Sequence, residues 1–231
     1  EVLLSLDSGD TKLSIRSGVG VGKTMIVSVL AVHFLLFRDD VKVIVTSPSF
    51  KQLADGIIPE VKGWINKLPA WLKATLDITA ERVSRLPEGD NNFISFRTAR
   101  KETPEALQGI HATHVLLLVD EASGVADAVF DAGAGTMSTA GAIVMLISNP
   151  TRVTGLFYKT HNKLKRLWKT WKITSSMSSR VDPSFPEHMK ATYGVDSQQY
   201  KIRVMAEFPE GNADSVIPRL WVEEAVSRDI D

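Results

Sequence analysis

Three glycines precede a lysine and a threonine in the stretch Ser17-Gly18-Val19-Gly20-Val21-Gly22-Lys23-Thr24. Glycines let consecutive backbone N–H groups turn inward, where a Cβ would obstruct the turn, and such amides bind phosphate oxygens. The lysine that ends such a loop neutralises the outer phosphates, and the threonine hydroxyl ligates Mg²⁺. Residues 17–24 therefore predict a phosphate-binding loop for ATP, with Mg²⁺ held in part by Thr24.

The first position of this loop departs from the usual pattern G-x-x-x-x-G-K-[ST], because Ser17 stands where a glycine is expected. A serine hydroxyl can also close a tight turn, so we interpret the loop as a variant. The alternative is a glycine-rich structural turn that happens to precede Lys23 and Thr24. A second motif further along the chain disfavours that alternative.

Two adjacent carboxylates, Asp120 and Glu121, end the apolar run of residues 115–119. A carboxylate at the carboxyl end of a parallel strand lies at the edge where ligands bind in open α/β sheets. There Asp120 would hold Mg²⁺ together with Thr24, and Glu121 would orient and deprotonate the water that attacks the γ-phosphate. We therefore expect Glu121 and Lys23 to be catalytic. An acidic turn exposed to solvent is the alternative for the two carboxylates taken alone.

Small polar residues end the next apolar run, at Ser148 and Asn149. At that edge of a sheet they could contact both the γ-phosphate and the attacking water, and so couple hydrolysis to movement. A strand that simply stops at Asn149 and Pro150 explains the same residues equally well.

The surrounding elements alternate between strands and helices. Apolar stretches predict buried strands at residues 12–16, 41–46, 93–96, 115–119 and 142–147, and a helix at residues 25–37. This order predicts an α/β fold of the P-loop NTPase type (ASCE or RecA-like), with a mostly parallel sheet flanked by helices. In this class an added strand separates the strand before the loop from the strand that ends in Asp-Glu.

We expect the ATPase core to span residues 1–153. Residues 154–231 would form its C-terminal part, a small lid or linker subdomain that contains a strand at residues 167–174. The longest apolar run, residues 25–37, is too short to cross a bilayer, so no membrane association is expected. The absence of cysteine excludes disulfides and thiolate metal sites.

The formal net charge is zero, so any contact with DNA must come from a local patch. The best patch spans residues 159–172, which carry several cations and no acidic residue. Its candidates for contacts with DNA phosphates are Lys163, Lys165, Arg166 and Lys169. An amphipathic edge whose tryptophans face the core is an equally good interpretation.

The motifs together resemble the ATPase domain of the large terminase subunit of tailed bacteriophages. The resemblance rests on residues 17–24, Thr46-Ser47-Pro48-Ser49, Asp120-Glu121-Ala122, Ser148-Asn149-Pro150-Thr151 and the distal stretch 200–209. It covers about residues 12–225. It implies a motor that hydrolyses ATP to drive double-stranded DNA into a preformed procapsid.

Several expectations follow from this resemblance alone. The active form would be a ring of subunits on the portal protein, in the cytoplasm of the infected bacterial host, with a small terminase subunit recognising the DNA. Members of the family usually carry a C-terminal nuclease domain. The chain stops at Asp231, so we expect that domain to be missing and no DNA cleavage.

Terminases often place a basic residue inside the phosphate-binding loop, but Val19 and Val21 stand there in this chain. The alternative candidates for an arginine that stabilises transition-state charge are Arg16, Arg152, Arg180 and Arg203. Each of them could equally be a surface residue or part of a structural salt bridge. The adenine contact stays unassigned. A helicase-like or other DNA-stimulated ATPase, and a nucleotide-dependent assembly switch, are the alternative functions.

Overall fold

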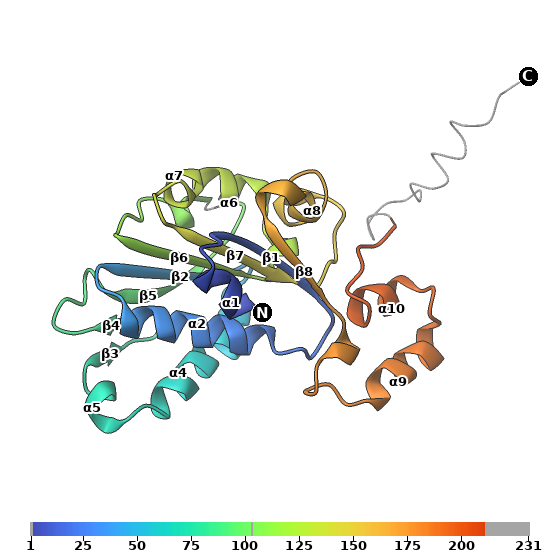
Figure 1. Ribbon diagram of the computed structural model, residues 1–231, viewed down its shortest axis with the longest axis horizontal. Helices are drawn as coiled ribbons and strands as arrows, with labels where there is room; N and C mark the ends of the chain where they lie inside the picture. Colours follow the sequence, from blue (N-terminus) through green and yellow to red (C-terminus); the bar gives the residue numbers. More distant parts are fainter. Residues whose placement is uncertain (1, 103, 211–231) are drawn as a thin grey trace, which may run out of the picture.

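The computed structural model describes residues 2–102 and 104–210. Its centre is a sheet of eight strands in the order β3-β4-β5-β2-β6-β7-β1-β8 (Figure 1). The strands are β1 (Lys12–Ser17), β2 (Val41–Ser47), β3 (Leu76–Ile78), β4 (Arg82–Arg85), β5 (Phe93–Thr98), β6 (His114–Asp120), β7 (Ile143–Ser148) and β8 (Lys169–Ile173). Neighbours from β5 to β8 pair in parallel, whereas β3 and β4 join in antiparallel fashion.

Helices cover both faces of this sheet. They are α1 (Val2–Asp7), α2 (Lys23–Phe37), α3 (Phe50–Gln52), α4 (Ile58–Asn66), α5 (Ala70–Lys73), α6 (Asp127–Ala132), α7 (Ala134–Met137), α8 (Gly155–His161), α9 (Ser184–Tyr193) and α10 (Gln198–Arg203). Figure 1 shows α2 and α4 on one face, α6, α7 and α8 on the other, and α9 and α10 beyond the edge strand β8.

The strands read as continuous apolar runs because each face of the sheet packs against helices. Val43 and Val45 of β2 belong to the core beneath α2 and α4. Ile44, between them, belongs to the second core, which also contains Phe157 of α8. Alternate residues of one strand therefore serve two cores, which confirms the predicted sheet flanked by helices.

Strand β7 lies between β1, which precedes the glycine-rich loop, and β6, which ends in Asp120. This is the added strand expected for the class. Because β1, β6 and β7 run in parallel, their carboxyl ends at Ser17, Asp120 and Ser148 meet at one edge of the sheet. The fold thus brings the three predicted motifs together.

The strand expected at residues 167–174 lies elsewhere than predicted. It is β8, and it pairs in parallel with β1 from Leu13 to Ser17, so it belongs to the main sheet. A C-terminal part beginning at residue 154 therefore does not coincide with a break in the sheet. The predicted end of that part, including residues 216–218, lies outside the described residues.

The long helix expected at residues 50–68 is interrupted as predicted, but earlier in the chain. A π-helical turn at Leu53–Ile57 separates α3 from α4. Pro59 lies in the first turn of α4, where its missing N–H breaks no helical hydrogen bond. The interruption therefore precedes the proline.

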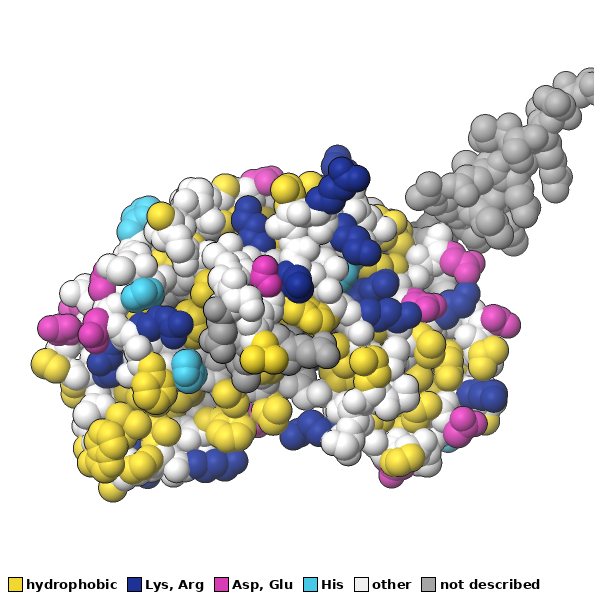
Figure 2. Space-filling model, viewed as in Figure 1, with side chains coloured by type: hydrophobic (Ala, Val, Ile, Leu, Met, Phe, Trp, Pro, Cys, Tyr) yellow, Lys and Arg dark blue, Asp and Glu magenta, His cyan; other side chains and the backbone are white. Residues whose placement is uncertain are grey.

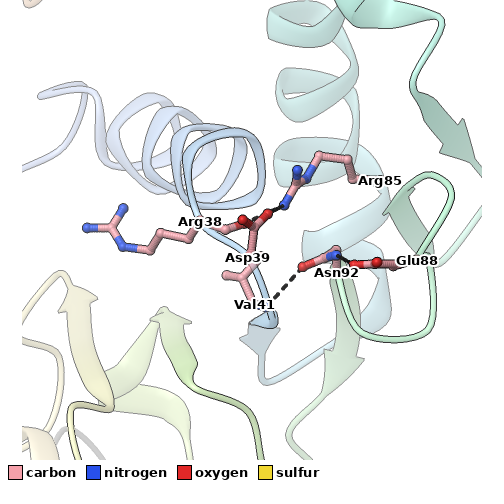
Figure 3. A network of polar contacts seen from close by, with 6 residues as sticks. All are labelled: Arg38, Asp39, Val41, Arg85, Glu88 and Asn92. Atoms are coloured by element: carbon pink, nitrogen blue, oxygen red, sulfur yellow. Dashed lines mark hydrogen bonds and ion pairs between the residues drawn. The ribbon is translucent and has the colours of Figure 1, made fainter.

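The hairpin of β4 and β5 is fastened to the turn between α2 and β2 (Figure 3). Arg85 donates to the Arg38 carbonyl at 2.5 Å and to the Asp39 carboxylate at 2.7 Å. The Val41 amide donates to the side-chain carbonyl of Asn92 at 3.2 Å. These contacts fix the amino end of β2 against the hairpin, and β2 in turn flanks β6. Within the described ranges, no helix is long and apolar enough to cross a membrane.

Candidate functional site

The glycine-rich loop leaves β1 at Ser17 and enters α2 at Lys23. Gly20 and Gly22 have φ angles of 79° and 96°, which an L side chain rarely adopts. The chain can therefore turn sharply here and present its amides at the N-terminus of a helix, where the backbone favours anions. A cavity of about 310 Å³ lies at this turn.

Only the second half of the loop lines that cavity. Gly20, Val21, Gly22, Lys23 and Thr24 are among its lining residues. The first half, which was also predicted to bind the nucleotide, is occupied by protein contacts.

Two amides in that first half are already paired. The Gly18 amide donates to the Ile173 carbonyl and the Val19 amide to the Arg203 carbonyl, both at 2.8 Å. Ser17 is fully buried at the end of β1, a regular strand position that does not require glycine. This position explains why the loop tolerates serine in place of its first glycine.

Two polar side chains at the end of β7 contact the predicted catalytic residues. Lys23 donates to the side-chain carbonyl of Asn149 at 2.9 Å, and the Asn149 amide donates to the Ser17 carbonyl at 2.6 Å. The Ser148 hydroxyl donates to the Glu121 carboxylate at 3.3 Å. Ser148 and Asn149 therefore connect the lysine of the loop with the glutamate after β6, a role that a simple strand stop would not give them.

Asp120 is buried and lacks a partner for one carboxylate oxygen. Its side chain is 7% exposed, and Oδ1 has no hydrogen-bond partner among residues 2–102 and 104–210. Burial, together with the neighbouring charge of Glu121, raises the pKa of the Asp120 carboxyl to about 6. An unpaired buried carboxylate is costly, so the site is suited to a cation.

Thr24, Asp120 and Glu121 line a second cavity of about 560 Å³. Mg²⁺ prefers oxygen ligands and is commonly held by one or two carboxylates together with substrate phosphates and water. The described part of the chain contains no cluster of three or more acidic or histidine side chains that could hold a metal alone. The residues present therefore fit Mg²⁺ that arrives with a nucleotide.

Glu121 lines both cavities and has a left-handed backbone, with φ 49° and ψ 40°. Side chains other than glycine rarely adopt this conformation, and it occurs more often where function demands a particular side-chain direction. It turns the chain directly after β6, so Asp120 and Glu121 can face the same edge of the sheet.

The four candidate arginines lie in different places. The Arg16 guanidinium lies 5.4 Å from the centre of the Phe208 ring, and burial lowers its pKa. Arg152 and Arg203 have exposed side chains, and neither lines the two cavities at the loop. Arg180 lines the cavity at the glycine-rich loop. Only Arg180 of the four is thus placed beside the loop.

Two contacts to the loop were not anticipated from the sequence. Ser175 donates its hydroxyl to the carbonyls of Val19, at 3.0 Å, and of Arg203, at 2.9 Å. No motif marks Ser175, and its position follows from the pairing of β8 with β1. Gln52, noted only as part of a weak signal, lines the second cavity and accepts a hydrogen bond from Ser47 at 2.9 Å.

The predicted DNA-contacting residues are exposed. Lys163, Lys165, Arg166 and Lys169 form no ion pair within the described residues, whereas Lys159 pairs with Asp127 and Lys172 with Glu207. In Figure 2, basic side chains gather over the region around α8. The half-buried Trp168 and Trp171 pack against the two cores, so they do not form an exposed stacking surface.

Part of this patch borders a hollow of about 330 Å³, lined among others by Lys12, Arg166 and Lys169. Lys12 and Lys169 begin β1 and β8, whereas the glycine-rich loop follows the end of β1. The predicted DNA patch and the predicted nucleotide site therefore lie at opposite edges of the sheet.

Comparisons with known proteins agree with this fold and site. Residues 15–224 match the family described as "Terminase large subunit, T4likevirus-type, N-terminal". The "Probable terminase, large subunit" of Enterobacteria phage P7 is 31% identical over 242 residues, covering 100% of this chain and 49% of that protein. The chain thus spans about half the length of this curated relative.

Two solved structures share the fold. The ATPase domain of the large terminase of Thermus phage P74-26 is 18% identical, covers 90% of this chain and 92% of that one, and gives a TM-score of 0.68. The large terminase of a thermophilic bacteriophage in complex with ADP is 15% identical, with 86% and 48% covered and a TM-score of 0.68. With the family match extending over most of its length, the chain belongs to the terminase large subunit family and corresponds to its N-terminal part.

Proposed function

We propose that the chain is an ATPase that uses Mg²⁺ and whose hydrolysis of ATP drives double-stranded DNA into a viral procapsid. The observation that carries the ATPase part is the contact of Lys23 with Asn149 beside the pair of Ser148 and Glu121. It gathers a phosphate-binding cation, two polar side chains and a carboxylate at the amides of one loop.

In this proposal, the free amides of residues 20–24 bind the phosphates and Lys23 neutralises the charge that develops on the outer ones. Glu121 orients the attacking water and accepts its proton. Ser148 holds the Glu121 carboxylate, and Asn149 holds Lys23, so both residues would register the loss of the γ-phosphate.

Thr24 and Asp120 would hold the metal ion. Mg²⁺ supplies positive charge that polarises the phosphoryl oxygens. The unpaired Asp120 Oδ1 supports this assignment.

The test of the ATPase assignment is Glu121→Gln, which keeps the side-chain shape but removes the base. We expect hydrolysis to fall by about a hundredfold or more, with ATP still bound. The matched control is Glu81→Gln, the same change at an exposed position. Unchanged hydrolysis in Glu121→Gln would contradict the assignment, and binding without any hydrolysis in the wild type would favour an assembly switch.

Translocation is proposed from family membership together with the exposed cations of residues 163–169. As in the relatives, portal protein and a small terminase subunit would be the partners, in the infected host cell. A motor must grip the DNA backbone irrespective of sequence, and unpaired surface cations suit phosphate contacts.

Binding to duplex DNA at several salt concentrations tests this patch. Removing Arg166 and Lys169 together should weaken binding to all sequences and lower the slope of log K against log salt by about 0.9 per lost contact. The control removes Lys67 and Lys190, two exposed lysines elsewhere. An equal loss in both double variants would contradict a specific DNA face.

A further inference from the structure

The segment between β8 and α9, residues 174–183, lies directly against the glycine-rich loop. A Cβ added to Gly20 would be 3.1 Å from Val181 Cγ2, and one added to Gly22 would be 3.2 Å from Arg180 Cδ. With the hydrogen bond from Ser175 to the Val19 carbonyl, these contacts cover the loop along its length. The segment is therefore part of the wall of the nucleotide site.

Arg180 is the cation that this segment brings to the cavity, on the side formed by Gly22 and Met25. Its Nε would lie 3.4 Å from a Cβ on Gly22, and its Nη1 lies 3.4 Å from the Met25 sulfur. A thioether is a weak acceptor for a group with five N–H donors.

Arg180 forms no ion pair with any carboxylate in residues 2–102 and 104–210. Glu60 lines the same cavity, but it accepts a hydrogen bond from the Trp64 indole at 3.0 Å. The guanidinium is thus available for an anion in the cavity.

Within residues 17–24, Lys23 is the single cation. A nucleoside di- or triphosphate carries several negative charges, and a planar guanidinium can bind two phosphate oxygens at once. Arg180 contacts the start of α2, whereas Glu121, Ser148 and Asn149 contact one another or the tip of Lys23. This division separates Arg180 from the groups that act on the transferred phosphate.

We propose that Arg180 binds the phosphates that are not transferred, on the nucleotide held by its own subunit. The proposal rests on the nucleotide site proposed above and adds a ligand from the C-terminal part of the chain. Arg180 is then a binding residue in cis, not an arginine supplied to a neighbouring subunit.

Nucleotide binding by the 231-residue chain tests this, with fluorescent ADP and a non-hydrolysable ATP analogue as probes. In Arg180→Ala we expect the Kd of both nucleotides to rise about tenfold or more, since a hydrogen-bonded charge pair is lost. Arg180→Lys should recover part of the affinity, because it keeps the charge without the planar fork. Lys190→Ala, an exposed lysine on α9, should leave both values unchanged.

The effect should lie in binding and not in turnover. At saturating ATP, kcat should change less than threefold in Arg180→Ala, because the interaction is equal in the ground state and the transition state. An unchanged Kd, or a large loss of kcat with unchanged Kd, would overturn the assignment. Equal melting temperatures without nucleotide would show that the variant folds.

A mixture separates action in cis from action in trans. Chains with Lys23→Ala lack the loop lysine but keep Arg180, so they could supply it to Arg180→Ala chains only across a subunit interface. We expect no high-affinity sites in the mixture, and their recovery would overturn the cis assignment. Failure of the wild type to bind either nucleotide would instead overturn the proposed function itself.

Discussion

Lys23 donates its ammonium group to the side-chain carbonyl of Asn149 at 2.9 Å, although the two residues lie 126 positions apart in the chain. The same asparagine donates to the Ser17 carbonyl at 2.6 Å. One side chain at the end of β7 thus holds both the beginning and the end of the phosphate-binding loop. This arrangement gives the residue after the central strand a direct influence on the lysine that meets the phosphates.

Replacing Asn149 should therefore impair the loop from a distance. In Asn149→Ala the Ser17 carbonyl loses its donor and Lys23 its partner, and we expect kcat/KM for ATP to fall about tenfold, equivalent to about 1.4 kcal/mol. Asn149→Asp should be more harmful, because an aspartate would pair with Lys23 in competition with the phosphates. Asn91→Asp, at an exposed turn, is the control. Equal activities of the Ala and Asp variants would contradict this competition.

Gly18 should not tolerate a side chain, although its φ is ordinary. An added Cβ would lie 2.8 Å from the Arg203 carbonyl oxygen and 2.9 Å from the Ser175 nitrogen, both backbone atoms. We expect Gly18→Ala to lower the free energy of unfolding by about 1–3 kcal/mol. Gly63, inside α4, has no atom within 4 Å of an added Cβ, so Gly63→Ala should raise it by about 0.5–1 kcal/mol. Denaturant titrations would measure both, and the same sign in both variants would be evidence against close packing at Gly18.

Asp120→Asn should stabilise the chain without nucleotide and abolish the stabilisation by Mg²⁺ with an ATP analogue. The pKa of Asp120 is raised from 3.8 to about 6, chiefly by burial. A raised carboxyl pKa means that ionisation costs stability as the pH rises from about 4 through about 6. Removing that charge should therefore raise the melting temperature at pH 7. A retained thermal shift with Mg²⁺ and nucleotide would contradict the metal assignment.

His161 should give the opposite dependence on pH. Burial, and then the charges of Arg16 and Lys165, lower the pKa of His161 from 6.5 to about 4, and its ring contacts Ser14 at 3.0 Å. The unfolded chain takes up this proton first, so stability is lost as the pH falls from about 6.5 towards 4. In His161→Gln this loss should be smaller.

The windows of His161 and Asp120 overlap with opposite signs, so their effects partly cancel in the wild type. Unfolding free energies at pH 7, 6, 5 and 4.5 would separate them. Relative to the wild type, Asp120→Asn should show a steeper loss of stability on acidification, and His161→Gln a shallower one. Parallel curves for all three chains would mean that neither group titrates abnormally.

Local pattern was enough to predict the central sheet and the ends of its strands. Residues 115–119 are continuously apolar because β6 is buried on both faces, and Asp120 marks the point where that burial stops. Gly20 and Gly22 are required by their left-handed backbones, which any sequence with this loop must satisfy. The fold class and the family were confirmed, whereas the roles of Lys23, Thr24, Asp120 and Glu121 stay predictions that this geometry supports.

The tertiary structure decided which groups remain free to act. The amides of Gly18 and Val19 are consumed by Ile173 and Arg203, and Arg180, not Arg16, reaches the cavity. These outcomes depend on the parallel pairing of β8 with β1, which joins segments about 150 positions apart and has no local signature. Sequence spacing determines a side chain's face within one element, but its partners across the sheet follow from strand order and register.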